Sequence, residues 1–167
     1  MDRSWHLLLT KPRGEEEAVS NLMDQEYEVY LPRISVKKLL RGRYKQVTEA
    51  MFPRYLFINL AAGVDSWGPI RSTPGVSGLV RFRMGHATAP DSLIEALRQR
   101  EDESGLIPQQ PHSLSKGDNV CIVDGPFKNI EAIFHAVSGE ERVILLMYIA
   151  GKEAKVRTSI HSLSPAS

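Results

Sequence analysis

The chain has 167 residues, 42% hydrophobic and 25% charged, which is typical of a water-soluble globular protein of one or two domains. No apolar run approaches the roughly 20 residues that cross a bilayer, and the single cysteine, Cys121, excludes an internal disulfide. With no signal-peptide pattern at the start, we expect a cytoplasmic protein without a membrane partner. The net charge of +1 conceals an asymmetry, because residues 1–100 carry a net +4 and residues 101–167 a net −3. This predicts a first part that faces a polyanion and a second part with a different purpose.

The first thirty residues predict a strand, a helix and a second strand. Residues 5–9 form a short apolar strand, and Glu15 begins a helix whose apolar residues recur at helical spacing. Residues 28–31 form the second strand, closed by Pro32. This order indicates a layered arrangement of helices and sheet.

Residues 33–45 predict a basic β-hairpin with its tip at residues 41–43. The segment contains six basic side chains and no acid: Arg33, Lys37, Lys38, Arg41, Arg43 and Lys45. Such a hairpin can lie along phosphates, or it can be a solvated loop. We favour nucleic acid slightly, because the hairpin has the same charge sign as five other basic residues: Lys11, Arg13, Arg71, Arg81 and Arg83.

Residues 52–82 are the stretch around which the chain is organised. Leu56 and Ile58 alternate with Tyr55 and Phe57, so both faces of this strand are apolar and we expect it inside a sheet covered on both sides. A turn at residues 74–75 leads to another strand that contains Phe82. The aromatic residues are either an apolar surface for a partner or ordinary core, and the pattern alone favours core.

The remaining pattern divides the chain into three parts. A helix follows Pro90 with a stripe of Leu93, Ile94 and Leu97, and Ser92 with Glu95 has capping-box spacing. We predict a first domain at residues 1–100, a polar linker at 101–114 and a tail domain at 115–167. Local preference in the tail is ambiguous between helix and strand.

The sequence contains no recognisable catalytic motif that would indicate an enzyme. The sequence contains no phosphate-binding loop, dinucleotide fingerprint, zinc spacing or nucleophile elbow. The five histidines are scattered, and Cys121 in an apolar stretch is better explained as a small buried hydrophobe than as a nucleophile. We therefore expect a protein that is not an enzyme and has no cofactor and no metal site.

Several motifs resemble the NusG-type transcription elongation factors. Their N-terminal (NGN) domain is similar to five segments here: the strand from Trp5, Lys11-Pro12, residues 30–32, residues 52–57, and Gly75-Val76 with residues 80–82. Residues 117–127 resemble the start of the C-terminal KOW domain. The resemblance implies an α+β protein. It would have an NGN-like α/β sandwich, with a mixed, mainly antiparallel sheet flanked by helices, and a small C-terminal domain.

Within that family the chain looks most like the RfaH-type paralogues. The hairpin tip followed by residues 47–49, the segment 131–134 and the run 145–149 are similar to theirs. The resemblance implies an operon-specific, monomeric antitermination factor that binds the clamp helices of RNA polymerase and the non-template DNA strand, and suppresses pausing. Its tail would cover the polymerase-binding surface as an α-helical hairpin. Once released, the tail would refold as a five-stranded KOW β-barrel and contact the small ribosomal subunit.

The resemblance also implies roles for individual residues. Polymerase-binding positions are Tyr55, Phe57, Phe82, Ile94 and Leu97; DNA-binding positions are Lys11, Arg13, Arg71 and Thr73; interdomain positions are Glu49, Arg142, Ile130, Phe134 and Leu146. The chain departs from the RfaH pattern at Pro74, where an arginine is usual, and at residues 66–68, where a polar patch contacts the polymerase gate loop.

Two alternatives stay open. One is a general NusG-like elongation factor whose tail is always a KOW barrel. The other is a KOW-containing protein that binds RNA or the ribosome and has no role at the polymerase; the tail alone allows it, but the first hundred residues do not favour it.

Overall fold

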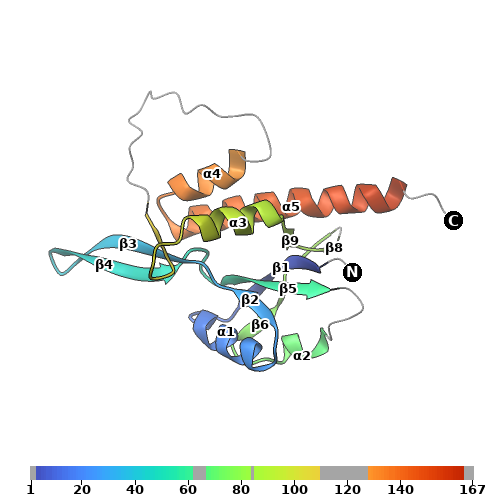
Figure 1. Ribbon diagram of the computed structural model, residues 1–167, viewed down its shortest axis with the longest axis horizontal. Helices are drawn as coiled ribbons and strands as arrows, with labels where there is room; N and C mark the ends of the chain where they lie inside the picture. The colour runs from blue at the N-terminus through green and yellow to red at the C-terminus, as the bar shows by residue number, and fades with distance from the viewer. Residues whose placement is uncertain (1–2, 62–66, 84, 110–127, 164–167) are drawn as a thin grey trace.

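The computed structural model describes residues 3–61, 67–83, 85–109 and 128–163 (Figure 1). A central antiparallel sheet has the strand order β2-β5-β1-β6, and β9 also pairs with β1. Its strands are β1 (Arg3–Thr10), β2 (Glu28–Tyr30), β5 (Tyr55–Ala61), β6 (Val76–Leu79) and β9 (Thr88–Ala89). The predicted inner strand is β5, which lies between β2 and β1.

Helices cover both faces of this sheet, as Figure 1 shows. On one face lie α1 (Glu15–Asp24) and α2 (Gly68–Arg71); on the other lie α3 (Asp91–Gln99), α4 (Lys128–His135) and α5 (Gly139–Leu163). Because side chains alternate along a strand, Leu56 and Ile58 of β5 join the core beneath α1, while Phe57 joins the core beneath α3, α4 and α5. The expectation of a strand buried on both faces is confirmed.

The basic segment forms the predicted hairpin. Strands β3 (Arg33–Leu40) and β4 (Arg43–Ala50) pair antiparallel, and the turn residues Arg41 and Gly42 have positive φ angles of 50° and 78°. The hairpin projects from the body of the molecule (Figure 1). Its end exposes Leu39, Leu40 and Tyr44 beside the basic side chains.

The sequence assigned residues 101–114 to a linker, but part of this segment belongs to a sheet. Strand β10 (Leu106–Pro108) pairs parallel with β3, and Ile107 is buried in the core. Leu106 and Ile107 are adjacent apolar residues in a polar segment, and removing their apolar surface from water favours the pairing with β3. A strand this short in a polar context has no periodic signal, so composition alone missed it.

Helix α3 starts differently from the expected capping box. Pro90 occupies the N-cap position in an extended conformation, with ψ 149°, and no side chain caps the helix. Ser92 therefore lies inside the first turn, where its hydroxyl cannot act as the N-cap. The predicted stripe of Leu93, Ile94 and Leu97 is fully buried.

The described part of the tail is helical. Helices α4 and α5 pack on each other and on the face of the central sheet that carries α3. Residues 117–127, which resemble the start of a KOW domain and include Cys121, lie outside the described residues. The small strands β7 (Arg81–Phe82) and β8 (Gly85–His86) form a two-stranded sheet beside β9.

Candidate functional site

The five predicted polymerase-binding residues lie together on one side of the molecule. Tyr55 and Phe57 point to the same face of β5, Phe82 comes from β7, and Ile94 and Leu97 come from α3. We call these five residues the apolar face. Phe57, Ile94 and Leu97 are at most 2% exposed, and the other two are partly buried.

The apolar face is covered by the tail. Helix α4 contributes Ile130, Ile133 and Phe134, and α5 contributes Leu146 and Ile149, all buried in the same core as Phe57, Ile94 and Leu97. Their spacing places them on one side of each helix. The structure thus brings Ile130, Phe134 and Leu146, predicted to be interdomain residues, against the predicted polymerase-binding residues.

Arg142 is the largest fully buried side chain in the described chain, with 1% exposure. Its Nε donates a hydrogen bond to the carbonyl oxygen of Met51 at 2.7 Å, and its Nη2 lies 3.4 Å from Glu49 Oε1. Burial lowers the pKa of Arg142, and Glu49 offsets part of this shift. Glu49 is itself shared, because Lys38 Nζ lies 2.6 Å from its other oxygen. The shorter bond to a backbone carbonyl is therefore the stronger link of Arg142 to the first domain.

Two further contacts join the tail to the first domain, and the sequence pointed to neither. Arg100, which follows α3, lies 3.1 Å from Glu131 of α4 and 4.0 Å from the centre of the Phe134 ring. At the start of α5, the backbone of Gly139 approaches Pro53 so closely that a Cβ would lie 2.7 Å from Pro53 Cγ. A salt bridge between residues 31 positions apart leaves no local pattern. The only sequence signal for the close approach to Pro53 is Gly139 itself, a glycine in a segment whose other residues favour a helix.

The predicted DNA-binding residues lie on the opposite side, around α1 and α2. Lys11 and Arg13 are exposed in the turn after β1, and Arg71 is exposed at the end of α2. The hydrogen bond from Lys11 N to Gly75 O, 2.8 Å long, holds this turn beside the segment that follows α2.

Thr73 does not belong with these exposed cations. It is 4% exposed, and its hydroxyl donates to Pro69 O and accepts from Gln25 Nε2, each at 2.8 Å. Both capacities of the hydroxyl are used inside the protein, so in this conformation Thr73 holds the turn and does not contact a ligand. The family resemblance implied a DNA-binding role for Thr73, and these two partners could not be read from the sequence.

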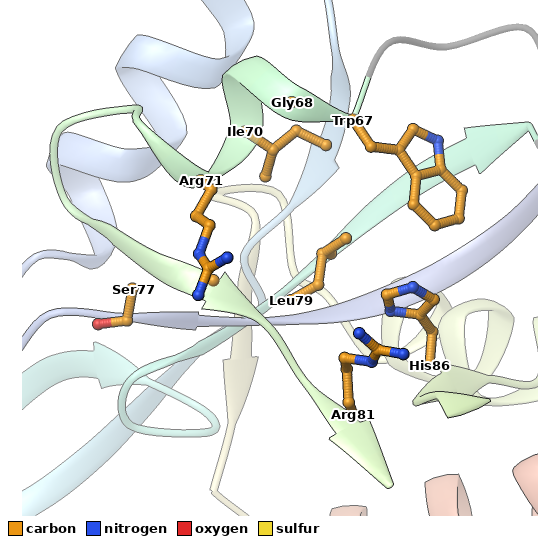
Figure 2. Close-up of a pocket in the computed structure, with 9 residues that line it drawn as sticks. Trp67, Gly68, Ile70, Arg71, Ser77, Leu79, Arg81 and His86 are labelled. Carbon is orange, nitrogen blue, oxygen red and sulfur yellow. The ribbon is translucent and has the colours of Figure 1, made fainter. Parts of the chain in front are cut away.

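A pocket of about 420 Å³ opens beside Arg71 (Figure 2). It is lined by Trp67, Gly68, Ile70, Arg71, Ser77, Gly78, Leu79, Arg81 and His86. The ring centroids of Trp67 and His86 are 5.1 Å apart in an edge-to-face arrangement, and His6 packs against both. Trp67 stands where the sequence departs from the RfaH pattern.

Within the described ranges, no group of three or more His, Cys, Asp or Glu side chains could hold a metal ion. In the same part of the chain, no helix combines the length and apolarity needed to cross a membrane. The features described above form two surfaces: a covered apolar face on one side and exposed cations with a pocket on the other.

Comparison with known proteins gives a family match. The family model described as "Transcription termination factor nusG" matches residues 3–98. This range contains all of the apolar face and all four predicted DNA-binding residues. Over it, the chain has the mixed sheets and flanking helices of a NusG N-terminal α/β domain.

Individual relatives match most of this chain. A "Transcription termination/antitermination protein NusG" from Thermus thermophilus is 29% identical over 178 residues, covering 93% of this chain and 95% of that protein. One from Streptomyces griseus is 26% identical and covers 92% of this chain, which spans only 58% of the length of that relative. A solved structure, "Domain interaction in Thermotoga maritima NusG", aligns with 77% of this chain and 76% of its own at a TM-score of 0.44 and 19% identity.

Proposed function

Because the chain belongs to the NusG family, we propose that it acts as a transcription antitermination factor of the RfaH type, whose tail hides its polymerase-binding surface until recruitment. The observation that carries this proposal is the burial of the apolar face under α4 and α5. A contiguous apolar surface of this composition, if exposed, would be typical of a binding site for another protein. Here the chain occupies it with its own tail.

The proposed action is binding that shifts a population. The clamp helices of RNA polymerase would replace α4 and α5 on the apolar face, and a factor that bridges the clamp would disfavour opened, paused states. The tail lowers the apparent affinity in proportion to the fraction of molecules in which it is released. Recruitment at a particular DNA element would supply the free energy that displaces the tail and so make the factor operon-specific.

On the opposite side, Lys11, Arg13 and Arg71 would contact the non-template strand in the transcription bubble. They are exposed in the conformation with the tail docked. The protein could therefore bind DNA through these side chains while the tail still covers the apolar face. Recruitment at a DNA element requires this order, with DNA binding first and release of the tail second.

The released tail would refold as a five-stranded KOW barrel and contact the small ribosomal subunit. One observation favours an alternative fold for this segment. In the helix, Ile144 and Tyr148 remain 62% and 58% exposed on α5 although Leu146 between them is fully buried. Because side chains alternate along a strand, Ile144, Leu146 and Tyr148 would share one face there and could all point into a closed barrel.

A general NusG-like factor with a permanent KOW barrel is the second candidate. It is favoured by the relatives, since those that match most of this chain carry the name of the termination/antitermination protein NusG. In that case the tail of the active protein would be folded as a barrel and not as helices, and it would not have to be released from the apolar face.

A protease site inserted between residues 110 and 127 separates these candidates. We expect the intact chain to bind purified RNA polymerase at least about tenfold more weakly than the cleaved chain, because docking competes with binding. Cleavage should also make the factor effective against pausing in a purified transcription reaction. Equal affinity before and after cleavage would favour the general factor.

Matched tyrosine variants test the surface. Tyr55→Ala in the cleaved chain should weaken polymerase binding, whereas Tyr44→Ala at the exposed hairpin end should leave it within about twofold. NMR secondary shifts of residues 113–167, alone and in the intact chain, test the refolding. Helical shifts in the intact chain with strand shifts in the fragment would support the switch, and strand shifts in both would refute it.

A further inference from the structure

The hairpin of β3 and β4 has one edge that no strand covers. Within the described residues, β4 pairs with β3 alone, whereas β10 occupies part of the other edge of the hairpin, at residues 33–35. The outer row of backbone N–H and C=O groups of β4 therefore has no strand beside it. The hairpin projects from the body of the molecule (Figure 1), and residues 43–46 are exposed with the tail docked. Another chain could reach this edge without displacing any described element.

The charge of this edge suits an acidic neighbour. Arg43 and Lys45 lie on one face of β4, and in the part of the chain that the structure describes neither forms an ion pair with a carboxylate. Lys45 stands directly opposite Lys38 of β3. Glu49 compensates Lys38 at 2.6 Å, but Lys45 is left beside a like charge, an arrangement that destabilises a strand pair. A carboxylate on a strand added beside β4 would relieve this repulsion.

The other face of β4 suits an apolar neighbour. Tyr44 is 67% exposed, and it stands directly opposite Leu39 of β3, which is 59% exposed. Cross-strand pairs of aromatic and aliphatic side chains stabilise a sheet. An apolar side chain on an added strand would extend the pair of Leu39 and Tyr44 into a longer row across the sheet and would cover both.

We propose that the outer edge of β4 binds an extended segment of a partner protein in which acidic and apolar residues alternate. The segment would add a strand to the β10-β3-β4 sheet through main-chain hydrogen bonds. Because side chains alternate along a strand, its carboxylates would lie beside Arg43 and Lys45 while its apolar side chains lie beside Tyr44. This surface shares no residue with the apolar face or with the predicted DNA-binding residues, so the inference goes beyond the proposed function.

Two other partners fit this edge less well. A nucleic acid would use Arg43 and Lys45, but it would leave the free backbone groups and the apolar pair of Leu39 and Tyr44 without partners. A second copy of this chain, paired edge to edge through β4, would bring cations of the two copies together. Lysine on an edge strand protects against such self-pairing, and the same charge attracts an acidic strand.

A peptide of about ten residues with alternating Glu and Val is the probe of this edge. Binding is followed by NMR in the intact, ¹⁵N-labelled chain. We expect chemical-shift changes at residues 43–48 and slower hydrogen exchange at those β4 amides that point away from β3. A peptide of the same composition in which all Glu residues precede all Val residues should bind more weakly, and so should a peptide of alternating Lys and Val.

Affinity for the labelled Glu-Val peptide, measured by fluorescence anisotropy, then tests the side chains. Arg43→Gln combined with Lys45→Gln should weaken binding about tenfold, and Tyr44→Ser about threefold. The matched control is Lys37→Gln combined with Arg41→Gln, which removes two exposed cations of the same hairpin outside β4 and should change the affinity by less than about twofold. Equal losses in the two double variants would mean general attraction of a polyanion and would overturn the proposal.

Three further results would also overturn it. Equal affinity for the alternating peptide and the one with separated Glu and Val residues would mean that no strand is formed, as would unchanged hydrogen exchange along β4. Shifts at residues 43–48 with single-stranded or duplex DNA, but with none of the peptides, would reassign the edge to nucleic acid. Dimerisation of the chain alone, lost on Arg43→Gln with Lys45→Gln, would reassign it to a second copy.

Discussion

The two sides of β5 are equally well buried but differ in what covers them. Leu56 and Ile58 pack under α1, in a core whose members all come from residues 8–79. Phe57, on the other side, packs under α3 and also under α4 and α5, which begin more than seventy residues later in the chain. Helices α4 and α5 contribute no strand to the central sheet, so the proposed release of the tail would leave its strand order unchanged.

The two covers also differ chemically. The only buried arginine among the described residues, Arg142, lies at the tail side. Burying a charge costs free energy that its partners only partly return, so such a contact specifies a position more than it stabilises one. Depth of burial is the same on both sides of β5 and so does not distinguish the permanent core from the cover whose release we propose, whereas chain connectivity and the buried charge of Arg142 do. Four predictions test this difference.

Removing a leucine on each side should give the largest contrast. Leu56→Ala leaves a cavity under α1 that nothing can relieve, and we expect it to lower the free energy of unfolding by about 2–5 kcal/mol. Leu146→Ala leaves a similar cavity under α5; if the tail detaches as proposed, the cost of this change cannot exceed the free energy of docking. Urea denaturation followed by circular dichroism measures both. Equal losses would mean that the tail is a permanent part of the core.

Arg142 and Glu49 should contribute unequally to docking. Arg142→Ala loses the 2.7 Å bond to Met51 O, and we expect docking to weaken by about 1.5–3 kcal/mol. Glu49→Ala should cost less, about 1 kcal/mol, because Glu49 Oε1 lies 3.4 Å from Arg142 Nη2 and the buried guanidinium keeps its bond to Met51 O. Tail NMR signals report the docked fraction. A larger effect of Glu49→Ala would show that the ion pair, and not the carbonyl bond, positions α5.

Two glycines on α5 should respond in opposite directions to the same change. Gly139→Ala places a methyl group against Pro53 and should weaken docking by about 1–3 kcal/mol. Gly151→Ala meets nothing within 4 Å and should stabilise the helical tail by up to about 1 kcal/mol through helix propensity. Polymerase affinity of the intact chain should rise with the first and fall with the second. The same direction for both would contradict a helical docked tail.

The pair Arg100 and Glu131 should have the smallest effect. Both side chains are partly exposed, so Glu131→Gln should weaken docking by about 0–1 kcal/mol, and less at high salt. Arg100→Ala should cost more than Glu131→Gln, because the guanidinium also covers the Phe134 ring at 4.0 Å. A titration of the docked fraction against salt separates the two parts. If both variants lose the same amount at every salt concentration, the ring contact contributes nothing.

The sequence pattern predicted correctly those segments that fit only one kind of secondary structure. The alternation in 55–60, the stripe in 93–97 and the basic tip at 41–43 became β5, α3 and the β3–β4 hairpin. Features that depend on distant partners were missed. Leu106 and Ile107 form a strand because they pair with the edge of β3. Thr73 is buried because Gln25 and Pro69 satisfy the hydrogen bonds of its hydroxyl. Arg100 forms its ion pair with Glu131, which lies 31 residues later in the chain.

The candidate surfaces divide in the same way. Resemblance to a family pointed to Tyr55, Phe57 and Phe82, although the pattern alone favoured ordinary core for these aromatics. The pocket beside Arg71 had no signal in the sequence, because Trp67, Arg81 and His86 come together only through the packing of α2 and β6 with the β7–β8 sheet.

The sequence by itself determined the central sheet, since a strand with two apolar faces must lie inside a layered fold. It did not determine the secondary structure of the tail. Every residue from 143 to 149 is apolar, and such a run satisfies the helical period and the strand period equally well. Only tertiary contacts decided the outcome. Leu146 and Ile149 are buried here as helical neighbours because Phe57, Ile94 and Leu97 offer them a surface, and the bond from Arg142 to Met51 holds α5 in place.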